Sequence, residues 1–337
     1  MCSLFVHGRT PLELTSIDLF CGAGGLSLGL ERAGFRPVLG LDLNKDACAT
    51  YRRAFPGAKV LQESVTGIDF HQWRGVDLIA GGPPCQPFSN GGKRLAADDV
   101  RDMLPEFVRA VNEALPRAFM MENVAGLLAP RNREYFDSVL ATISDRYTVL
   151  PPRIVNAADY GVPQKRLRVM VIGFLKGGLD FPAPTHRLGR YVTSGSVIQR
   201  GEVLGNPNPS KVVFAKTPDL RPSCYAGQLF NGGGRALNLD QPAPTILASA
   251  GGNKTHFVDE MDLVPPYHKH LWDGGKPKVG ALRGGRRLTV LESALLQSFP
   301  REMVFEGSRS SQYTQIGNAV PPRLAEVVGA SIARAFH

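Results

Sequence analysis

Apolar and polar positions predict strands and helices that alternate over the first half of the chain and return at its end. Short apolar runs bounded by glycine or polar residues predict buried strands, and they cover residues 16–20, 38–41, 60–65, 76–80, 118–121 and 169–172. Apolar residues three or four positions apart predict helices at residues 26–33, from about 45, at 101–115 and in the last segment to 335. Strands that alternate with helices form a sheet with helices on both faces. We therefore predict an α/β fold with a doubly wound, mostly parallel sheet.

The pattern changes from about Gly173 onward. Residues 171–285 hold 18 of the 37 glycines and 11 of the 26 prolines, with 13 Lys and Arg against 8 Asp and Glu. Aromatic and histidine side chains are interspersed there, at His186, Tyr225, Phe230 and Tyr267. Long, positive loops of this kind suit a surface that contacts DNA. The regular pattern returns near residue 286, where Thr289 and Glu292 have the spacing of a capping box.

The composition restricts the class of protein. The 337 residues suffice for one large domain or two ordinary ones. A net charge of +9 and a pI near 9.5 favour a polyanionic partner. Five cysteines without Cys-x-x-Cys spacing argue against a disulfide framework or a structural zinc site, and we predict no bound metal. The sequence has no apolar run of about 18 residues and no signal-peptide pattern, so we expect a soluble, cytoplasmic protein with no membrane partner.

A glycine-rich turn follows the first predicted strand. Cys21-Gly22-Ala23-Gly24-Gly25 precedes a helix, and its glycines let a ligand approach the backbone at the helix N-terminus. The dinucleotide-binding spacing Gly-x-Gly-x-x-Gly is not met, because Ser27 stands where the third glycine belongs. The turn is therefore either a structural turn or a nucleotide site. Asp42, after the second strand, likewise either accepts ribose hydroxyls or caps the helix that begins near Lys45.

Reactive groups accompany three further strands. The stiff loop Gly81-Gly82-Pro83-Pro84-Cys85-Gln86-Pro87-Phe88-Ser89-Asn90 places one cysteine at the carboxyl end of a strand, where open α/β sheets bind ligands. Glu122 follows another buried strand, and burying an unpaired carboxylate is costly. The basic segment 165–168 precedes a third strand. The plainer interpretations are an incidental thiol, a structural carboxylate and a solvated basic face. Segment 91–94, with two glycines and two cations, is either a solvated loop or one that closes over a polyanion.

Six segments resemble motifs of the DNA cytosine-5 methyltransferases, in the order in which that family carries them. They are Asp18–Leu26, Pro83–Ser89, Glu122–Val124, Gln164–Arg168, Arg286–Glu292 and Gly317–Pro322. Pro244–Leu247 is similar to a threonine-containing landmark of the family's target-recognition domain. The closest resemblance is to the compact prokaryotic restriction-modification type. It implies a Rossmann-like catalytic domain that binds S-adenosylmethionine (residues 1–183 and 304–337) and a smaller, loop-rich target-recognition domain with its hinge (residues 184–303).

The resemblance also implies roles for individual residues. Those implied to bind S-adenosylmethionine, which becomes S-adenosylhomocysteine, are Phe20, Gly22, Ala23, Gly25, Leu26, Asp42, Ser64, Pro83, Asn318 and Ala319. Asp42 stands where the family usually has Glu, and Ser64 where it commonly has an acidic residue that binds adenine. The implied catalytic residues are Cys85, Glu122, Asn123, Gln164, Arg166 and Arg168. Gln164 and Arg166 are implied to brace the site. Contacts with double-stranded DNA are expected from Gln86, Ser89, Lys93, Arg94, Arg235 and Lys254.

The chemistry of cytosine accounts for the implied catalytic groups. Carbon 5 is a poor nucleophile, and addition of the Cys85 thiolate at carbon 6 would push electron density onto it. Glu122 at ring nitrogen 3 and Arg168 at the carbonyl would stabilise the adduct, while Asn123 would hold the Cys85 loop. Because the reaction cannot occur inside a stacked duplex, the cytosine must be flipped out into a cleft between two lobes.

We therefore expect a monomeric, sequence-specific DNA cytosine-5 methyltransferase, belonging either to a restriction-modification system with a separate restriction endonuclease or to an orphan methylation system. Two alternatives are a tRNA methyltransferase of the same family and a non-catalytic DNA-binding relic. The large basic insert argues against the first, because reading a duplex requires such a surface. The intact catalytic set argues against the second. The failed dinucleotide spacing disfavours a nicotinamide-dependent oxidoreductase.

Overall fold

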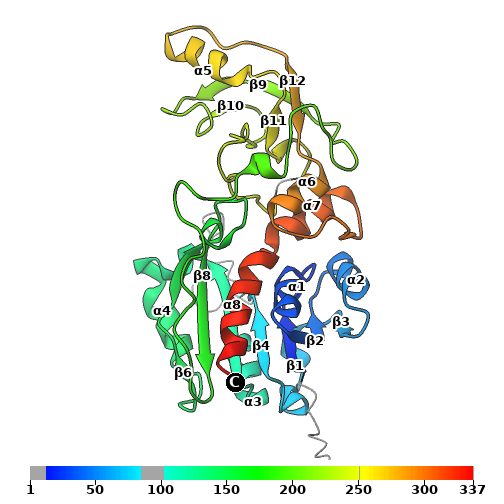
Figure 1. Ribbon diagram of the computed structural model, residues 1–337, viewed down its shortest axis with the longest axis vertical. Helices are drawn as coiled ribbons and strands as arrows, with labels where there is room; N and C mark the ends of the chain where they lie inside the picture. Colours follow the sequence, from blue (N-terminus) through cyan, green and yellow to red (C-terminus); the bar gives the residue numbers. More distant parts are fainter. Residues whose placement is uncertain (1–12, 85–101, 250, 337) are drawn as a thin grey trace, which may run out of the picture.

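The computed structural model describes residues 13–84, 102–249 and 251–336, which form two lobes joined by a short helical segment (Figure 1). The first lobe contains an eight-stranded sheet with the order β3-β2-β1-β4-β5-β8-β6, in which β7 also pairs with β8. Its strands are β1 Leu14–Leu19, β2 Phe35–Leu41, β3 Lys59–Leu61, β4 Leu78–Gly81, β5 Ala118–Val124, β6 Thr148–Val149, β7 Arg153–Asn156 and β8 Leu167–Phe174. The five strands from β3 to β5 are parallel, as predicted, and β8 runs antiparallel to β5, β6 and β7.

Helices cover both faces of this sheet, which confirms the doubly wound arrangement. The helices are α1 Gly25–Arg32 and α8 Pro322–Arg334 on one face, and α3 Leu104–Ala114 and α4 Pro130–Leu140 on the other. Phe119 and Met121 of β5 enter one core and Met120 enters the other, because successive side chains of a strand point to opposite faces. The strands read as continuous apolar runs since both faces are covered. In the described residues, no helix is long and apolar enough to cross a membrane.

The C-terminal helix α8 returns to the first lobe and packs closely against α1. A Cβ added at Gly29 would lie 2.3 Å from the carbonyl oxygen of Pro322, and one at Gly25 would lie 2.4 Å from that of Val320. Only glycine permits this approach. The two glycines therefore allow the segment before α8 to lie beside the glycine turn at the start of α1.

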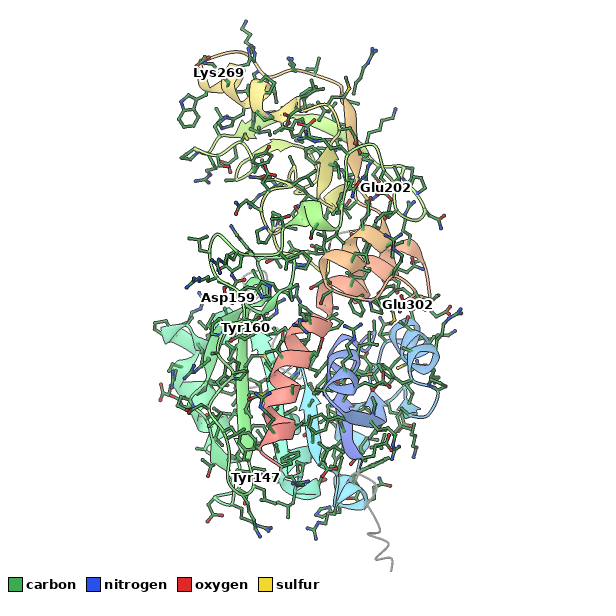
Figure 2. The ribbon with its side chains drawn as sticks, in the orientation of Figure 1. Tyr147, Asp159, Tyr160, Glu202, Lys269 and Glu302 are labelled. Atoms are coloured by element: carbon green, nitrogen blue, oxygen red, sulfur yellow. The ribbon has the colours of Figure 1, made fainter. Side chains whose placement is uncertain are left out.

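The second lobe is smaller and contains more irregular structure (Figure 1). Its antiparallel sheet has the order β10-β9-β12-β11. The elements are β9 Lys211–Asp219, β10 Gln228–Phe230, β11 Phe257–Asp259, β12 Ala281–Arg287 and the helix α5 Val264–Trp272. Phe230, Phe257, Tyr267 and Leu282 belong to its core. Helix α5, which carries Lys269, lies at the outer end of the lobe (Figure 2).

Two helices, α6 Val290–Leu296 and α7 Arg309–Asn318, lie between the lobes (Figure 1). One apolar cluster joins them to segments of the second lobe, and its members include Leu237, Ile246, Leu288, Leu296, Phe299 and Ile316. The predicted domain boundary between residues 303 and 304 separates α6 from α7, which contact each other. The division into domains is therefore a proposal about function, and the joint itself is one packed unit.

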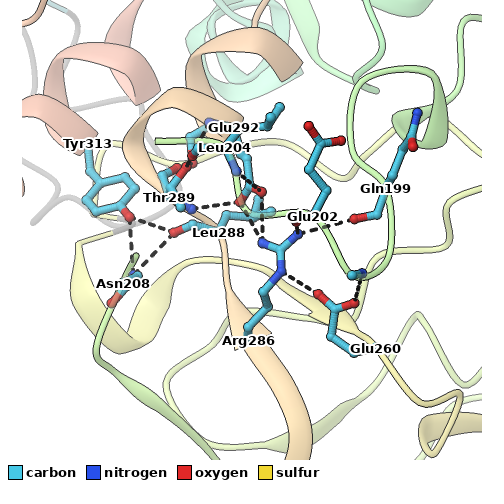
Figure 3. Close-up of polar contacts among 12 residues, drawn as sticks. Gln199, Glu202, Leu204, Asn208, Glu260, Arg286, Leu288, Thr289, Glu292 and Tyr313 are labelled. Atoms are coloured by element: carbon cyan, nitrogen blue, oxygen red, sulfur yellow. Dashed lines mark hydrogen bonds and ion pairs between the residues drawn. The ribbon is translucent and has the colours of Figure 1, made fainter. Parts of the chain in front are cut away.

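Polar contacts around Arg286 fix the second lobe to this joint (Figure 3). Arg286 Nη1 lies 2.8 and 2.9 Å from the two carboxylate oxygens of Glu292, and the same guanidinium pairs with Glu260 and donates to the carbonyl of Glu202. The predicted capping box is present, because the Thr289 hydroxyl accepts the N–H of Glu292 and the Glu292 carboxylate accepts the N–H of Thr289. Glu292 is fully buried, so its charge depends on Arg286.

Candidate active site

One cavity of about 610 Å³ opens at the carboxyl edge of the first sheet, where the first lobe meets the joint. Its volume is in the range of small-molecule cofactor sites. The predicted site residues that line it are Phe20, Gly22, Gly25, Leu26, Asp42, Pro83, Glu122, Asn123, Arg166, Arg168, Asn318 and Ala319. Residues 246–248 and, from the segment before α8, Thr314, Gln315, Gly317 and Val320 also line it. Of these, 246–248 and the residues before Asn318 had no predicted contact with the site.

Asp42 connects the glycine turn to the end of β2. Its carboxylate accepts the backbone N–H of Gly22 at 2.9 Å and that of Asn44 at 2.8 Å. The N-cap of α2 (Lys45–Ala54) is Asn44, whose side chain accepts the N–H of Ala47, so the capping interpretation of Asp42 is not the one observed. Gly22 has a φ of 52°, and a Cβ there would meet nothing within 4 Å. The turn thus presents open backbone and a fixed carboxylate to the cavity.

A buried carboxyl group lies beneath this turn, and the sequence analysis gave it no role. Asp18 is 1% exposed and accepts a hydrogen bond from the Ser27 hydroxyl at 2.6 Å. The Ser27 oxygen also lies 2.7 Å from the hydroxyl of Tyr51. Burial raises the pKa of Asp18 to about 7, although the Ser27 hydrogen bond acts in the opposite direction. Ser27, which breaks the dinucleotide spacing, therefore anchors the strand end that carries the turn.

Glu122 and Arg168 form an ion pair on adjacent antiparallel strands, β5 and β8. Arg168 Nε lies 2.7 Å from Glu122 Oε1, with the two side chains 14% and 10% exposed. The contact does not have hydrogen-bond geometry, and Glu122 Oε1 has no hydrogen-bond partner among the described residues. Gly82 faces this carboxylate, since a Cβ there would lie 3.3 Å from Glu122 Oε2. The pair therefore places an acidic group, Glu122, and a cation, Arg168, in the cavity wall, where both could contact a polar ring.

Asn123 holds the start of the cysteine loop. Its side-chain nitrogen donates to the carbonyl oxygen of Pro83 at 3.0 Å, and its side-chain oxygen accepts the N–H of Val124 at 2.8 Å. Pro84 is in turn bonded through its carbonyl to the N–H of Met103, at 3.1 Å. The expected residues Cys85, Gln86, Ser89, Lys93 and Arg94 lie outside the described residues. Two contacts thus fix the points on either side of the undescribed segment.

Arg166 and Gln164 bind backbone groups from distant parts of the chain. Arg166 donates to the carbonyl oxygens of Ile246 at 3.2 Å and Gly317 at 2.9 Å. Burial lowers the pKa of Arg166 to about 9, with nearby Arg168 acting in the same direction. Gln164 accepts the N–H of Ile246 at 3.1 Å and donates to the carbonyl of Leu296 at 3.4 Å. Both side chains are buried and connect β8 to the joint, which is a bracing arrangement.

The other predicted residues lie elsewhere. Ala23 is buried in the apolar cluster of the joint and is not among the residues that line the cavity. Ser64 is not among them either, and it caps a short 3-10 helix by accepting the N–H of Thr66. Lys254 is exposed at the end of another short helix in the second lobe.

A second cavity, of about 660 Å³, lies between the two lobes. Lys165, Leu167 and Arg168 line it from the first lobe, and Tyr225 and Arg235 are among those that line it from the second. Arg168 lines both cavities, so the two adjoin at that residue. Three cations facing a shared opening favour a polyanion there.

These features define a class of protein: an α/β enzyme with a nucleotide-type cofactor site beside a polar reaction centre, open to a basic cleft. A family model described as C-5 cytosine-specific DNA methylase matches residues 14–198 and 244–334. The chain therefore belongs to this family and is an S-adenosylmethionine-dependent DNA cytosine methyltransferase. The residues that the family model leaves between these ranges, 199–243, belong mainly to the second lobe.

Individual relatives agree with this assignment. The Type II methyltransferase M1.HphI of Haemophilus parahaemolyticus is 36% identical, over 95% of this chain and 87% of that protein. The Type II methyltransferase M.NgoMIV of Neisseria gonorrhoeae is 34% identical, over 96% of this chain and 99% of that protein. A DNA modification methyltransferase encoded within a prophage of Escherichia coli has a crystal structure that matches with a TM-score of 0.70 at 24% identity, covering 96% and 99% of the two chains. The structural match supports the fold.

Proposed function

We propose that the chain methylates carbon 5 of a flipped-out cytosine within a short sequence of duplex DNA. Residues 1–183 and 304–337 carry out the catalysis, and residues 184–303 recognise the target. One observation carries the proposal: a single cavity is lined by the glycine turn with Asp42, by the Glu122–Arg168 pair and by Pro83 and Pro84 of the cysteine loop. The cofactor and the reacting base would therefore meet in one place.

The cavity fits the cofactor of the family at the glycine turn. The Asp42 carboxylate is fixed by two backbone N–H groups and keeps acceptor capacity for ribose hydroxyls. Phe20 and Leu26 offer apolar surface, and the open backbone at Gly22 admits close approach. Asn318 and Ala319 line the same cavity near α1, on the side proposed for the methionine portion. Bound S-adenosylmethionine supplies an electrophilic methyl group.

The remaining groups act on the cytosine ring. The Cys85 thiolate adds to carbon 6, and Glu122 gives a hydrogen bond or proton to nitrogen 3, so that carbon 5 would become nucleophilic toward the sulfonium methyl group, with S-adenosylhomocysteine as the leaving group. A base then removes the proton from carbon 5, the bond from sulfur to carbon 6 breaks, and the thiolate leaves. Arg168 stabilises negative charge at the carbonyl oxygen. Asn123 keeps the loop in position through Pro83.

The second cavity supports a route by which duplex DNA would reach the site. Lys165, Arg168 and Arg235 supply the positive charge that the phosphate backbone requires. The cytosine rotates out of the duplex in this cleft and enters the first cavity past Arg168, which lines both. Gln86, Ser89, Lys93, Arg94 and Lys254 are proposed as further DNA contacts.

The proposal extends to the biological setting. M1.HphI and M.NgoMIV are named Type II methyltransferases. We propose that this chain likewise protects DNA from a restriction endonuclease encoded separately. It would act in the cytoplasm as a monomer without a metal.

Transfer of labelled methyl groups tests the proposal. Purified protein is incubated with labelled S-adenosylmethionine and either unmethylated duplex DNA or tRNA. We expect label in the DNA and none in the tRNA. Label in tRNA alone would assign the chain to RNA, and tight DNA binding without any transfer would indicate a non-catalytic relic.

A further inference from the structure

A glycine-rich loop of the second lobe, residues 231–235, is held at both ends by buried or partly buried side chains. Gly232 and Gly233 have φ values of 84° and 83°, and a Cβ at Gly234 would lie 1.8 Å from the carbonyl oxygen of Thr255. At the first end, Arg287 donates to the backbone oxygen of Asn231 at 2.9 Å. Glycine is thus required at the tip, while the ends have fixed positions.

His256 holds the second end. Its Nδ1 accepts the backbone N–H of Arg235 at 3.1 Å. Because that nitrogen is the acceptor, the ring hydrogen is on Nε2, which donates to the carbonyl of Thr245 at 3.3 Å. The imidazole thus links residues 231–235, which we call the reading loop, to the threonine-containing landmark at residues 244–247. Burial lowers the pKa of His256 to about 4, and Arg235 and Arg287 act in the same direction, so the ring is neutral near pH 7.

The chain of contacts continues into the catalytic lobe. The Thr245 hydroxyl donates to the carbonyl oxygen of Lys165 at 2.7 Å. Lys165 is followed directly by Arg166, and the next residue after Thr245 is Ile246, which lines the first cavity and is bonded to both Gln164 and Arg166. The segment that His256 contacts is therefore part of the active-site wall.

The two ring contacts are additional to a backbone attachment of the same loop. The backbone of Arg235 is already secured to Phe257, whose N–H donates to the Arg235 carbonyl at 3.0 Å, and Leu237 donates to the Phe257 carbonyl at 2.9 Å. The loop would remain attached without the imidazole. What the ring adds is a fixed distance between Arg235 and Thr245, which line the same interlobe cavity. A neutral ring suits this position, because a doubly protonated ring could not accept the Arg235 N–H at Nδ1.

We propose that His256 is a positioning residue that sets Arg235 against the Thr245 segment and so couples target reading in the second lobe to methyl transfer in the first. The inference rests on the proposed function, because it requires DNA in the interlobe cavity. The two ring nitrogens have separate tasks: Nδ1 places the reading loop, and Nε2 places the wall of the active site.

Two substitutions separate these tasks in the full-length protein. His256→Asn puts an acceptor near the position of Nδ1 and loses the donor to Thr245, whereas His256→Gln reaches toward the position of Nε2 and loses the acceptor for Arg235. One lost hydrogen bond corresponds to about a threefold to tenfold effect. We expect His256→Gln to raise the KM for duplex DNA and reduce the preference for the target over single-base variants, with kcat unchanged. We expect His256→Asn to lower kcat with little change in KM.

His270→Gln is the matched control. His270 also lies in the second lobe and its Nε2 is 3.0 Å from a backbone oxygen, that of Lys276, but it is next to Lys269 at the outer end (Figure 2). The His270→Gln variant should have the kcat, the KM for duplex DNA and the target preference of wild type. Two results would overturn the role of His256 and leave the proposed function standing. One is kinetics equal to wild type in both His256 variants, and the other is the same fall in kcat and rise in KM in both variants together with a lowered Tm. Absence of methyl transfer to DNA by wild type would overturn the proposed function and this inference together.

Discussion

The two lobes hold their functional side chains and loops in position by different physical means. In the first lobe, apolar side chains on both faces of the sheet pack beneath four helices, and the chemistry lies at strand ends, as with Glu122 after the buried run of β5. In the second lobe, buried or partly buried Arg286 and Arg287 hold loops through directional polar contacts. Burial of apolar surface is non-directional, whereas a buried ion pair needs its partner. We therefore expect single substitutions at the site to remove activity without unfolding the first lobe, and substitutions of buried charges to destabilise the second.

The largest expected effect is on the rate of methyl transfer alone. Cys85→Ser should lower methyl transfer on the order of 10⁴-fold or more, because a hydroxyl replaces the thiolate nucleophile. DNA affinity and Tm should stay at wild-type values. Single-turnover kinetics with labelled cofactor measure the change. Retention of substantial turnover would rule out the covalent mechanism.

The next effect is on stability in the second lobe. Arg286→Met leaves fully buried Glu292 without its cation, so the free energy of unfolding should fall by about 3 kcal/mol in urea titrations. Arg200→Met is the control, since it removes an exposed ion pair with Asp262, also at 2.8 Å, and should cost less than about 1 kcal/mol. Equal losses in the two variants would show that burial of the pair is unimportant.

A smaller effect is expected where the first lobe holds the cysteine loop. Asn123→Ala removes the hydrogen bond to Pro83 and should lower kcat about fivefold, since about 1 kcal/mol of loop positioning is lost. The KM for the cofactor should not change. Asn112→Ala removes a comparable bond to the Thr142 carbonyl, remote from the cavity, and should leave kcat at the wild-type value. If the two variants have the same kcat, Asn123 does not position the loop.

A further effect is expected on stability, as a pH dependence that arises from the buried carboxyl group beneath the glycine turn. The pKa of Asp18 is raised by burial to about 7, from an ordinary value of 3.8. Its contribution to stability is therefore fully present below pH 3.8 and is lost as pH rises through 7. Asp18→Asn keeps an acceptor for Ser27 and removes this dependence. Its Tm relative to wild type should be higher at pH 8 than at pH 5, by calorimetry, and an equal difference at the two pH values would refute the assignment.

The sequence pattern was most informative in the first lobe, because strands covered on both faces are apolar throughout. Its boundaries were less accurate. β2 begins at Phe35 rather than at residue 38. The strand includes Pro37, which pairs with Ser16 where the register to β1 shifts, and a proline within an apolar run does not predict a strand. β5 continues through Glu122 to Val124 because these residues pair with β8. An apolar run does not indicate strand direction, so the antiparallel direction of β8 could not be predicted from the sequence.

The second lobe was predictable only as a basic, loop-rich insert. β9 is a strand of half-exposed residues that pairs with β12, some 70 positions away, and it has no clear alternation. His256, Arg287 and Glu292 act on backbone groups far along the chain, so only the folded structure shows their partners. In the site, Gly22 and Asp42, which the motif resemblance implied as cofactor contacts, line the first cavity, whereas the resemblance gave no role to Asp18.

A single-base map of 5-methylcytosine tests the central claim most directly. Wild type and the Asn123→Ala and His256→Gln variants each methylate the same unmethylated genomic DNA. If the first lobe performs the chemistry and the second reads the target, wild type marks cytosines in one short motif, Asn123→Ala marks fewer copies of that motif, and His256→Gln spreads the marks to related sequences. Marks in unrelated contexts for wild type, or a changed motif for Asn123→Ala, would contradict this division of labour.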